Sequence, residues 1–262
     1  MRAATGVFTA AVLVASAVPA GAQTNFVSLV DHLHLAAPDQ AAAVAWYAKH
    51  FGGVPMTAEA PDRLMFGQTR VIFQRSASAE PSSGSVLDHI GFSVPDLDAT
   101  MTALAADGAK VVTPARDAPG LFRLAFVEDP WGVRLEVVQD AETLGLHHIH
   151  LRAPDPAAML AWCTDAFGGS ITKLKDRLDG INYGGVWILA QRGDAVPSAG
   201  HAIDHMGMRP VNVDRAVEGL KAKDVKVTTE PRPLTLPSGV SMRLAFIEGP
   251  EGVRIELVQR DR

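Results

Sequence analysis

Asp31-His32-Leu33-His34-Leu35 is the first of four similar stretches in this chain, each placing a His on an apolar strand. The other three are Asp88-His89-Ile90-Gly91-Phe92, His147-His148-Ile149-His150-Leu151 and Asp204-His205-Met206-Gly207-Met208. Each is followed later by a Gly with a Gln seven residues further on: Gly67 and Gln74, Gly132 and Gln139, Gly184 and Gln191, Gly252 and Gln259. The recurrence predicts four copies of one structural module.

Two nested periods organise these copies. The strand histidines are 57 residues apart within each half of the chain and 116 residues apart between halves: His32, His89, His148 and His205. Glu256 lies 120 residues after Glu136, so the second half carries four extra residues. Neighbouring matches put this insertion in Leu234 to Val240, a stretch with Pro and Gly that we expect to form a loop.

Each module is predicted to run strand, helix, then three strands. In the first, Leu29 to Ala36 alternates as a strand does, Pro38-Asp39 opens a helix and Gly52-Gly53 ends it, before three short strands up to Arg75. One module is too small to bury a core alone, so modules must pair. The predicted fold is α+β, with four βαβββ modules paired into two curled mixed-sheet cups.

We expect two domains, 29–140 and 145–260, each containing two modules. We expect modules to pair within each half, although the sequence leaves pairing across the halves open. Exchange of modules would bring His32 to Glu256 instead of Glu136.

Residues 1–22 have the pattern of a cleaved signal peptide. Arg2 precedes an apolar run from Val7 to Val18, and Ala20-Gly21-Ala22 is a small-residue cleavage site before Gln23. The alternatives are a first helix of the fold or an uncleaved anchor. A cleaved signal predicts a periplasmic or secreted protein with no membrane contact after cleavage.

The net charge and the cysteine count indicate which kinds of partner and cross-link to expect. The formal charge is −5, and it becomes −6 once Arg2 is removed. We therefore do not expect the protein to bind nucleic acid. Cys163 is the single cysteine, which rules out an internal disulfide and is interpreted as a packed, unreactive thiol. We expect a monomer or homodimer that binds a small molecule.

The His and Glu residues form the candidate site. Residues two apart on a strand face one side, so His34 should project with His32, and His150 with His148. Gly91 and Gly207 stand at the matching positions of the other modules, which suggested room there for a small molecule. A Glu appears only in alternate modules, at Glu136 and Glu256. Two His and one Glu are the ligand count of an open metal site.

Other residues have less certain roles. Arg134 and Arg254 lie two residues before the Glu and are candidates for holding the anionic end of a substrate, or else pair with nearby acids. A lone strand His is otherwise more often a core residue than a ligand. The repeated Gln residues are interpreted as structural, and three further histidines as surface residues: His50, His147 and His201.

The chain resembles the vicinal oxygen chelate superfamily, which includes glyoxalase I, methylmalonyl-CoA epimerase, extradiol dioxygenases, fosfomycin-inactivating transferases and bleomycin-binding proteins. The marks are 88–96 (DHIGFSVPD), 46–53 (WYAKHFGG) and 129–136 (DPWGVRLE), and the resemblance spans Leu29 to Gln259. The family's metal positions match two sets, His32, His89 and Glu136 in one half, and His148, His205 and Glu256 in the other.

Departures from individual subfamilies leave the activity open. Glyoxalase-like members use a further ligand or base where this chain is expected to have Val71 and Ile188. Extradiol dioxygenases use an additional His and Tyr, which are missing between Ile90 and Glu136 and between Met206 and Glu256. The fosfomycin-inactivating transferases are two-module chains whose substrate-binding residues have no match here.

Two hypotheses follow. The first is an exported enzyme that uses Fe²⁺, Mn²⁺ or Zn²⁺ to chelate a small oxygen-bearing substrate, in a lyase, isomerase, transferase or dioxygenase reaction, with His34 and His150 moving a proton. The second is a binding or sequestration protein of the bleomycin-resistance type, without turnover.

Overall fold

The computed structural model describes residues 25–56, 60–236 and 239–260. The predicted signal peptide, residues 1–22, lies outside these residues. No helix in the described ranges is long and apolar enough to cross a membrane.

Every module has the predicted order of elements. The first contains β1 (Phe26–Ala37), α1 (Gln40–Phe51), β2 (Val54–Pro55), β3 (Arg63–Phe66) and β4 (Thr69–Arg75). The second contains β5 (Leu87–Ser93), α2 (Leu97–Ala106), β6 (Lys110–Asp117), β7 (Arg123–Glu128) and β8 (Arg134–Gln139). The third contains β9 (Gly145–Ala153), α3 (Pro156–Phe167), β10 (Thr172–Leu174), β11 (Leu178–Tyr183) and β12 (Val186–Arg192). The fourth contains β13 (Ile203–Pro210), α4 (Val213–Lys221), β14 (Lys226–Thr235), β15 (Ser241–Glu248), a short 3₁₀ turn η1 (Pro250–Gly252) and β16 (Arg254–Arg260).

The helices begin where the sequence predicts. Each follows a residue whose side chain accepts a backbone N–H of the first turn: Asp39, Asp96, Asp155 and Asn212. These side chains satisfy donors that have no partner within the helix. The end of α1 is set by Gly52, which adopts a left-handed φ of 75°.

The strands form two eight-stranded mixed sheets, as predicted, but modules pair across the halves of the chain. One sheet has the order β14-β15-β16-β13-β1-β4-β3-β2 and joins the fourth module to the first. The other has the order β10-β11-β12-β9-β5-β8-β7-β6 and joins the third to the second. The expectation that modules pair within each half, which grouped His32 with Glu136, is therefore wrong.

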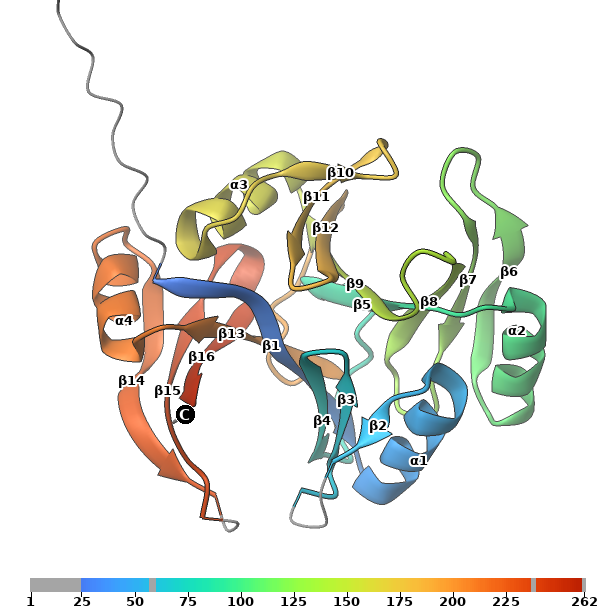
Figure 1. Cartoon of the computed structure of the whole chain (residues 1–262), viewed down its shortest axis with the longest axis horizontal. Helices are drawn as coiled ribbons and strands as arrows, with labels where there is room; N and C mark the ends of the chain where they lie inside the picture. Colours follow the sequence, from blue (N-terminus) through green and yellow to red (C-terminus); the bar gives the residue numbers. More distant parts are fainter. Residues whose placement is uncertain (1–24, 57–59, 237–238, 261–262) are drawn as a thin grey trace, which may run out of the picture.

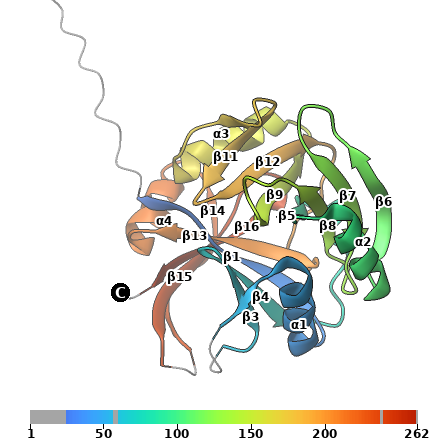
Figure 2. The ribbon, with the colours of Figure 1, turned by 45° about the vertical axis from the view of Figure 1, so that its right-hand side comes forward.

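Each sheet curls into an arch, with β14 and β2 at the two ends of one and β10 and β6 at the ends of the other (Figure 1). We call these the 1/4 cup and the 2/3 cup, after their modules. Helices α1 and α2 gather at one end of the molecule and α3 and α4 at the other (Figures 1 and 2).

Helix contacts tie together the modules that are neighbours in sequence. Trp46 of α1 donates its Nε1–H to the carbonyl of Asp107 at 3.1 Å, and the Tyr47 hydroxyl donates to Asp129 at 2.7 Å. His50, predicted at the surface, has a largely covered ring that pairs with the Asp107 carboxylate at 2.8 Å. The first half is thus held together by a helix and buried side chains, while its strands pair with those of the second half.

The apolar core runs between the helices and the convex sides of the sheets and includes Cys163, which is 1% exposed. Burial raises the pKa of this thiol to about 12, which fits the prediction of an unreactive cysteine.

Candidate metal sites

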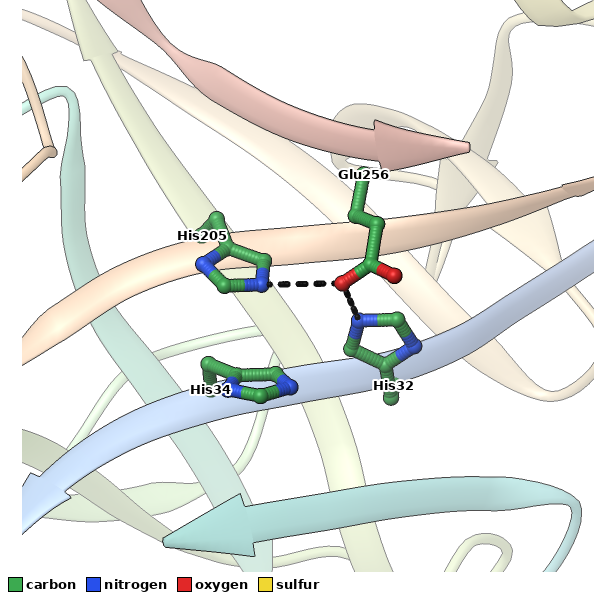
Figure 3. A group of neighbouring side chains, drawn as sticks. All are labelled: His32, His34, His205 and Glu256. Atoms are coloured by element: carbon green, nitrogen blue, oxygen red, sulfur yellow. Dashed lines mark hydrogen bonds and ion pairs between the residues drawn. The ribbon is translucent and has the colours of Figure 1, made fainter. Parts of the chain in front are cut away.

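The structure brings the predicted His and Glu residues into two clusters. Site 1, in the 1/4 cup, contains His32 and His34 of β1, His205 of β13 and Glu256 of β16 (Figure 3). Site 2, in the 2/3 cup, contains His89 of β5, Glu136 of β8, and His148 and His150 of β9. In each site the four residues offer ligand atoms that all lie within 4.8 Å of one another. All six predicted metal ligands are present, but each Glu meets one His from each half of the chain.

In site 1 a single carboxylate oxygen faces two imidazoles. Glu256 Oε2 lies 3.3 Å from His205 Nε2 and 3.2 Å from His32 Nε2 (Figure 3). His34 stacks on His205, with ring centroids 4.2 Å apart. Four potential donors therefore converge from three adjacent strands.

Site 2 repeats this arrangement. Glu136 Oε2 lies 3.2 Å from His89 Nε2 and 3.1 Å from His148 Nε2. The ring of His150 is 4.5 Å from that of His89, between centroids.

Antiparallel pairing of the first strands sets this geometry. In β1 and β13, His34 pairs with His205 and His32 pairs with Gly207. A Cβ on Gly207 would lie 2.2 Å from Cε1 of His32, and one on Gly91 would lie 2.0 Å from Cε1 of His148. The two glycines therefore accommodate an imidazole across the strand. The expectation that they leave room for a small molecule is wrong.

Three of the four strand histidines are oriented by the preceding Asp. Nδ1 of His32, His89 and His205 lies 3.0, 2.7 and 2.5 Å from Asp31, Asp88 and Asp204, respectively. A ring that donates from Nδ1 presents the Nε2 lone pair to the site. These Asp residues are not among the predicted site residues, although the Asp-His pair repeats in three of the four stretches.

The fourth strand histidine has a different support. His147 occupies the place of the Asp, and its Nδ1 lies 2.9 Å from Nδ1 of His148. Its Nε2 lies 3.4 Å from Asp140, which also pairs with Lys175 at 3.0 Å. His147 is fully buried, so its interpretation as a surface residue is wrong.

The charges within each site support one another. Burial raises the pKa of Glu136 and Glu256, but hydrogen bonds from two His residues outweigh it and hold both pKa values below the ordinary range. Burial lowers the pKa of His32 and His89, but their bonds to Asp and Glu outweigh it and raise the pKa. Each Glu is therefore ionised at neutral pH.

The extra histidines have the opposite balance. Burial, followed by the neighbouring imidazoles, lowers the pKa of His34 and His150 well below its usual value. Their rings are neutral at pH 7, with a lone pair free to bind a cation or accept a proton.

Arg134 and Arg254 each pair with an Asp that holds a His of the site. Arg134 Nη1 lies 3.0 Å from Asp88, and its guanidinium covers the Phe126 ring at 4.7 Å. Arg254 Nη1 lies 2.7 Å from Asp204. The Arg254 guanidinium covers the Phe246 ring in the same way, with Cζ 4.5 Å from the ring centroid. These contacts match the alternative that both pair with nearby acids; substrate binding by either stays a prediction.

The positions matching Glu136 and Glu256 in the other modules are one residue further on than the sequence suggested. Gly207 pairs with Glu256, and the equivalent His34 pairs with Ile72, just as His150 pairs with Leu189. Val71 and Ile188 instead belong to the hydrophobic core. Both corrected residues are aliphatic, so the conclusion that the last strands of modules one and three supply no ligand is unchanged.

The repeated glutamines include two structural residues, as predicted. Oε1 of Gln139 accepts the N–H of Leu97 at 3.3 Å, and Oε1 of Gln259 accepts that of Val213 at 3.0 Å. Each bond ties the last strand of a module to the first turn of its helix.

A cavity opens beside each site. A cavity of about 290 Å³ next to site 1 is lined by His32, His34 and Glu256. A cavity of about 380 Å³ in the 2/3 cup reaches His150. Both lie near the lower end of the size range of small-molecule pockets, about 300–1,000 Å³.

Comparison with known proteins agrees with this architecture. The family model of the Glyoxalase/Bleomycin resistance protein/Dioxygenase superfamily matches residues 29–137 and 145–257. Among solved structures, glyoxalase I from Zea mays is 19% identical with a TM-score of 0.70, covering 88% of this chain and 92% of that one. A "putative dioxygenase" from Bacillus subtilis is 13% identical with a TM-score of 0.59, covering 90% and 86%. No curated protein sequence matches this chain.

We predict that Gly207→Ala displaces the His32 imidazole and weakens metal binding at site 1 by about 10- to 100-fold, the usual effect of disturbing the support of a ligand. Titration against a chromophoric chelator measures this, and site 2 should keep its affinity. Gly219→Ala in α4 is the control, since a Cβ there meets nothing within 4 Å. Unchanged affinity at site 1 in Gly207→Ala would show that His32 is not a ligand.

Proposed function

We propose that this chain, which belongs to the Glyoxalase/Bleomycin resistance protein/Dioxygenase superfamily, is a divalent-metal enzyme that acts on a small oxygen-bearing substrate. The observation that carries the proposal is that each buried Glu directs one oxygen at the Nε2 atoms of two His whose other ring nitrogens are held by side chains.

The donor set fits a divalent transition metal. Two to three imidazoles with one carboxylate suit Fe²⁺, Mn²⁺ or Zn²⁺. Nδ1 of His34 and of His150 is buried and has no hydrogen-bond partner within the described residues. His32, His205 and Glu256 would hold the ion in site 1, and His89, His148 and Glu136 in site 2.

The protein's own groups prepare the site for chemistry. These residues would hold a divalent ion that, when bound, would polarise two adjacent oxygens of a substrate and lower the cost of negative charge on them. Asp31, Asp88 and Asp204 fix the ring orientation of the ligand histidines. His34 and His150 lie beside the ligands as neutral imidazoles, which is the state required to take a proton from the substrate.

The proposed reaction is of the lyase, isomerase, transferase or dioxygenase class. Ile72 and Leu189, at the positions that match the Glu ligands, favour a second candidate, a binding protein of the bleomycin-resistance type. These aliphatic side chains can neither bind a metal nor carry a proton. A cup that purifies metal-free and stays so after incubation with Mn²⁺, Fe²⁺ or Zn²⁺ would favour that candidate.

Metal stoichiometry tests the assignment. We predict two metal equivalents per chain, one of which is lost in Glu136→Ala and the other in Glu256→Ala, since each cup has its own Glu. Inductively coupled plasma mass spectrometry after dialysis measures the content. Glu218→Ala, on the exposed side of α4, is the control and should keep both. Full metal content in both site variants would refute the metal sites.

The roles of the extra histidines are separable from those of the ligands. We predict that His34→Ala and His150→Ala keep their metal but lose about 10²–10⁴-fold in turnover, the usual contribution of a general base. Turnover is measured with the substrate that a screen of the holoprotein identifies. Loss of metal in His34→Ala, with metal retained in His32→Ala, would mean that ligand and base have been assigned the wrong way round.

We further propose that the chain is exported and that residues 1–22 are removed. Arg2, the apolar run and the Ala20-Gly21-Ala22 site support this. N-terminal sequencing of the native protein should find Gln23 first, in the periplasmic or secreted fraction. Met1 at the start of the soluble cytoplasmic protein would contradict export. The assembly, a monomer or homodimer, is an expectation that gel filtration tests.

A further inference from the structure

The two sites have the same types of candidate ligand. They differ in the charged residues that surround His32 in site 1 and His148 in site 2. Four positions around His32 and His148 correspond by strand register and repeat spacing. Site 1 has there Asp31, Arg70, Arg209 and Arg260. Site 2 has instead His147, Trp187, Ser93 and Asp140. With His counted as neutral, the formal charge at these four positions is +2 in site 1 and −1 in site 2, where Lys175 pairs with Asp140 at 3.0 Å.

A single carboxylate gathers the three guanidiniums of site 1. Asp31 is fully buried and lies 2.7 Å from Arg260 Nη2, 2.8 Å from Arg209 Nε and 3.5 Å from Arg70 Nη1. One carboxylate neutralises only one of them. The remaining positive charge lies on side chains that are 18–29% exposed, so salt screens it less than it screens fully exposed charges.

The cavity of site 1 adds further guanidiniums. Arg63, Arg75 and Arg260 line it together with His32, His34 and Glu256. The counterpart of Arg63 in the 2/3 cup is Gly180, since Arg63 pairs with Ile72 and Gly180 with Leu189.

The Arg63 guanidinium is held by Asp62 and keeps N–H donors for other partners. Its bidentate pair with Asp62, at 2.7 and 3.0 Å, uses two of its five N–H donors. Within the described residues its other three N–H groups form no hydrogen bond, so they can donate to a ligand. Arg75 is exposed at the rim of the same cavity.

The rest of the wall limits the size and shape of a ligand. Leu236, from the loop of the four-residue insertion, and Met242 supply an apolar surface opposite the guanidiniums on β3 and β4. In the 2/3 cup the cavity beside His150 balances Arg177 and Arg192 against Asp155 and Asp179. The cavity of site 1 has three Arg against two acids, Asp62 and Glu256, so it has one Arg in excess, which the cavity of the 2/3 cup lacks.

Building on the proposed function, we propose that site 1 takes a small acid whose two adjacent oxygens face the metal ligands while a second, distal carboxylate binds Arg63 and Arg75. Arg and carboxylate form strong, charge-assisted hydrogen bonds, and the planar guanidinium matches both carboxylate oxygens. A cavity of about 290 Å³ suits a short-chain dicarboxylate rather than a large conjugate.

Two matched probes test the proposal, 2-oxoglutarate and 2-oxobutyrate, which share the chelating 2-oxo acid but differ in the distal carboxylate. Calorimetry on Mn²⁺-loaded Glu136→Ala, in which only site 1 holds metal, should show 2-oxoglutarate binding about 10- to 100-fold more tightly than 2-oxobutyrate. Mn²⁺-loaded Glu256→Ala, which keeps only site 2, should show no such preference.

Arginine variants in the Glu136→Ala background locate the effect. Arg63→Gln and Arg75→Gln should each reduce the preference by about tenfold or more while the Mn²⁺ content stays at one equivalent. Arg192→Gln is the matched control, because Arg192 is the counterpart of Arg75 in the 2/3 cup. Arg75 is exposed, so its variant should fold even if Arg63→Gln does not.

The outcomes separate the two proposals. Failure of the wild-type chain to load Mn²⁺, Fe²⁺ or Zn²⁺ would overturn the proposed function, and this inference with it. Normal loading with equal affinity for the two acids, or a preference untouched in Arg75→Gln, would overturn the dicarboxylate inference alone.

Discussion

Antiparallel pairing of the first strands across the two halves of the chain is the constraint on which both sites depend. It places His32 opposite Gly207 and His34 opposite His205, and it repeats this arrangement in the other sheet. Because a side chain at either Gly would occupy the space of the opposing imidazole, the pairing and the Gly are needed together. The helices meanwhile pack module against neighbouring module, through contacts such as that of Tyr47 with Asp129. The interlaced halves therefore build each site from both ends of the sequence.

A chain of contacting polar side chains runs from the surface side of each cup to its centre. In the 1/4 cup, Arg254 contacts Asp204, Asp204 contacts His205, and His205 contacts Glu256. Burying such groups is costly unless each is paired, and removal of one partner leaves an uncompensated charge. The bonds of His32 and His89 to the preceding Asp and to the Glu raise the pKa of both imidazoles despite their burial, so a proton held there balances the carboxylates. A divalent ion would displace that proton and take over its role, so metal binding should release protons.

The sequence predicted the modules and the residues of the sites more reliably than their grouping. Periods of 57 and 116 residues identify every strand His, and an offset of 120 residues matches Glu136 to Glu256 once the four-residue insertion is allowed for. Pairing between modules could not be derived, since four similar first strands offer four similar edges. Counting from Gly67 placed the match to Glu256 at Val71, one residue short of Ile72, and a slip of one residue exchanges the core face of a strand for the cup face. His147 looked isolated because its counterparts in the other modules are Asp.

The two cups show which parts of the arrangement tolerate change. Both keep two first-strand His, an extra His and a Glu, and both keep an acidic residue near the second nitrogen of each ligand, directly or through His147. A cup that only enclosed an organic ligand would gain nothing from fixing imidazole rings in this way, because apolar walls serve that purpose at lower desolvation cost. Behind His32 and His148, by contrast, three guanidiniums are exchanged for Trp187, Ser93 and Asp140. The conserved inner arrangement therefore points to a shared metal chemistry, and the divergent charges around it to different ligands in the two cups.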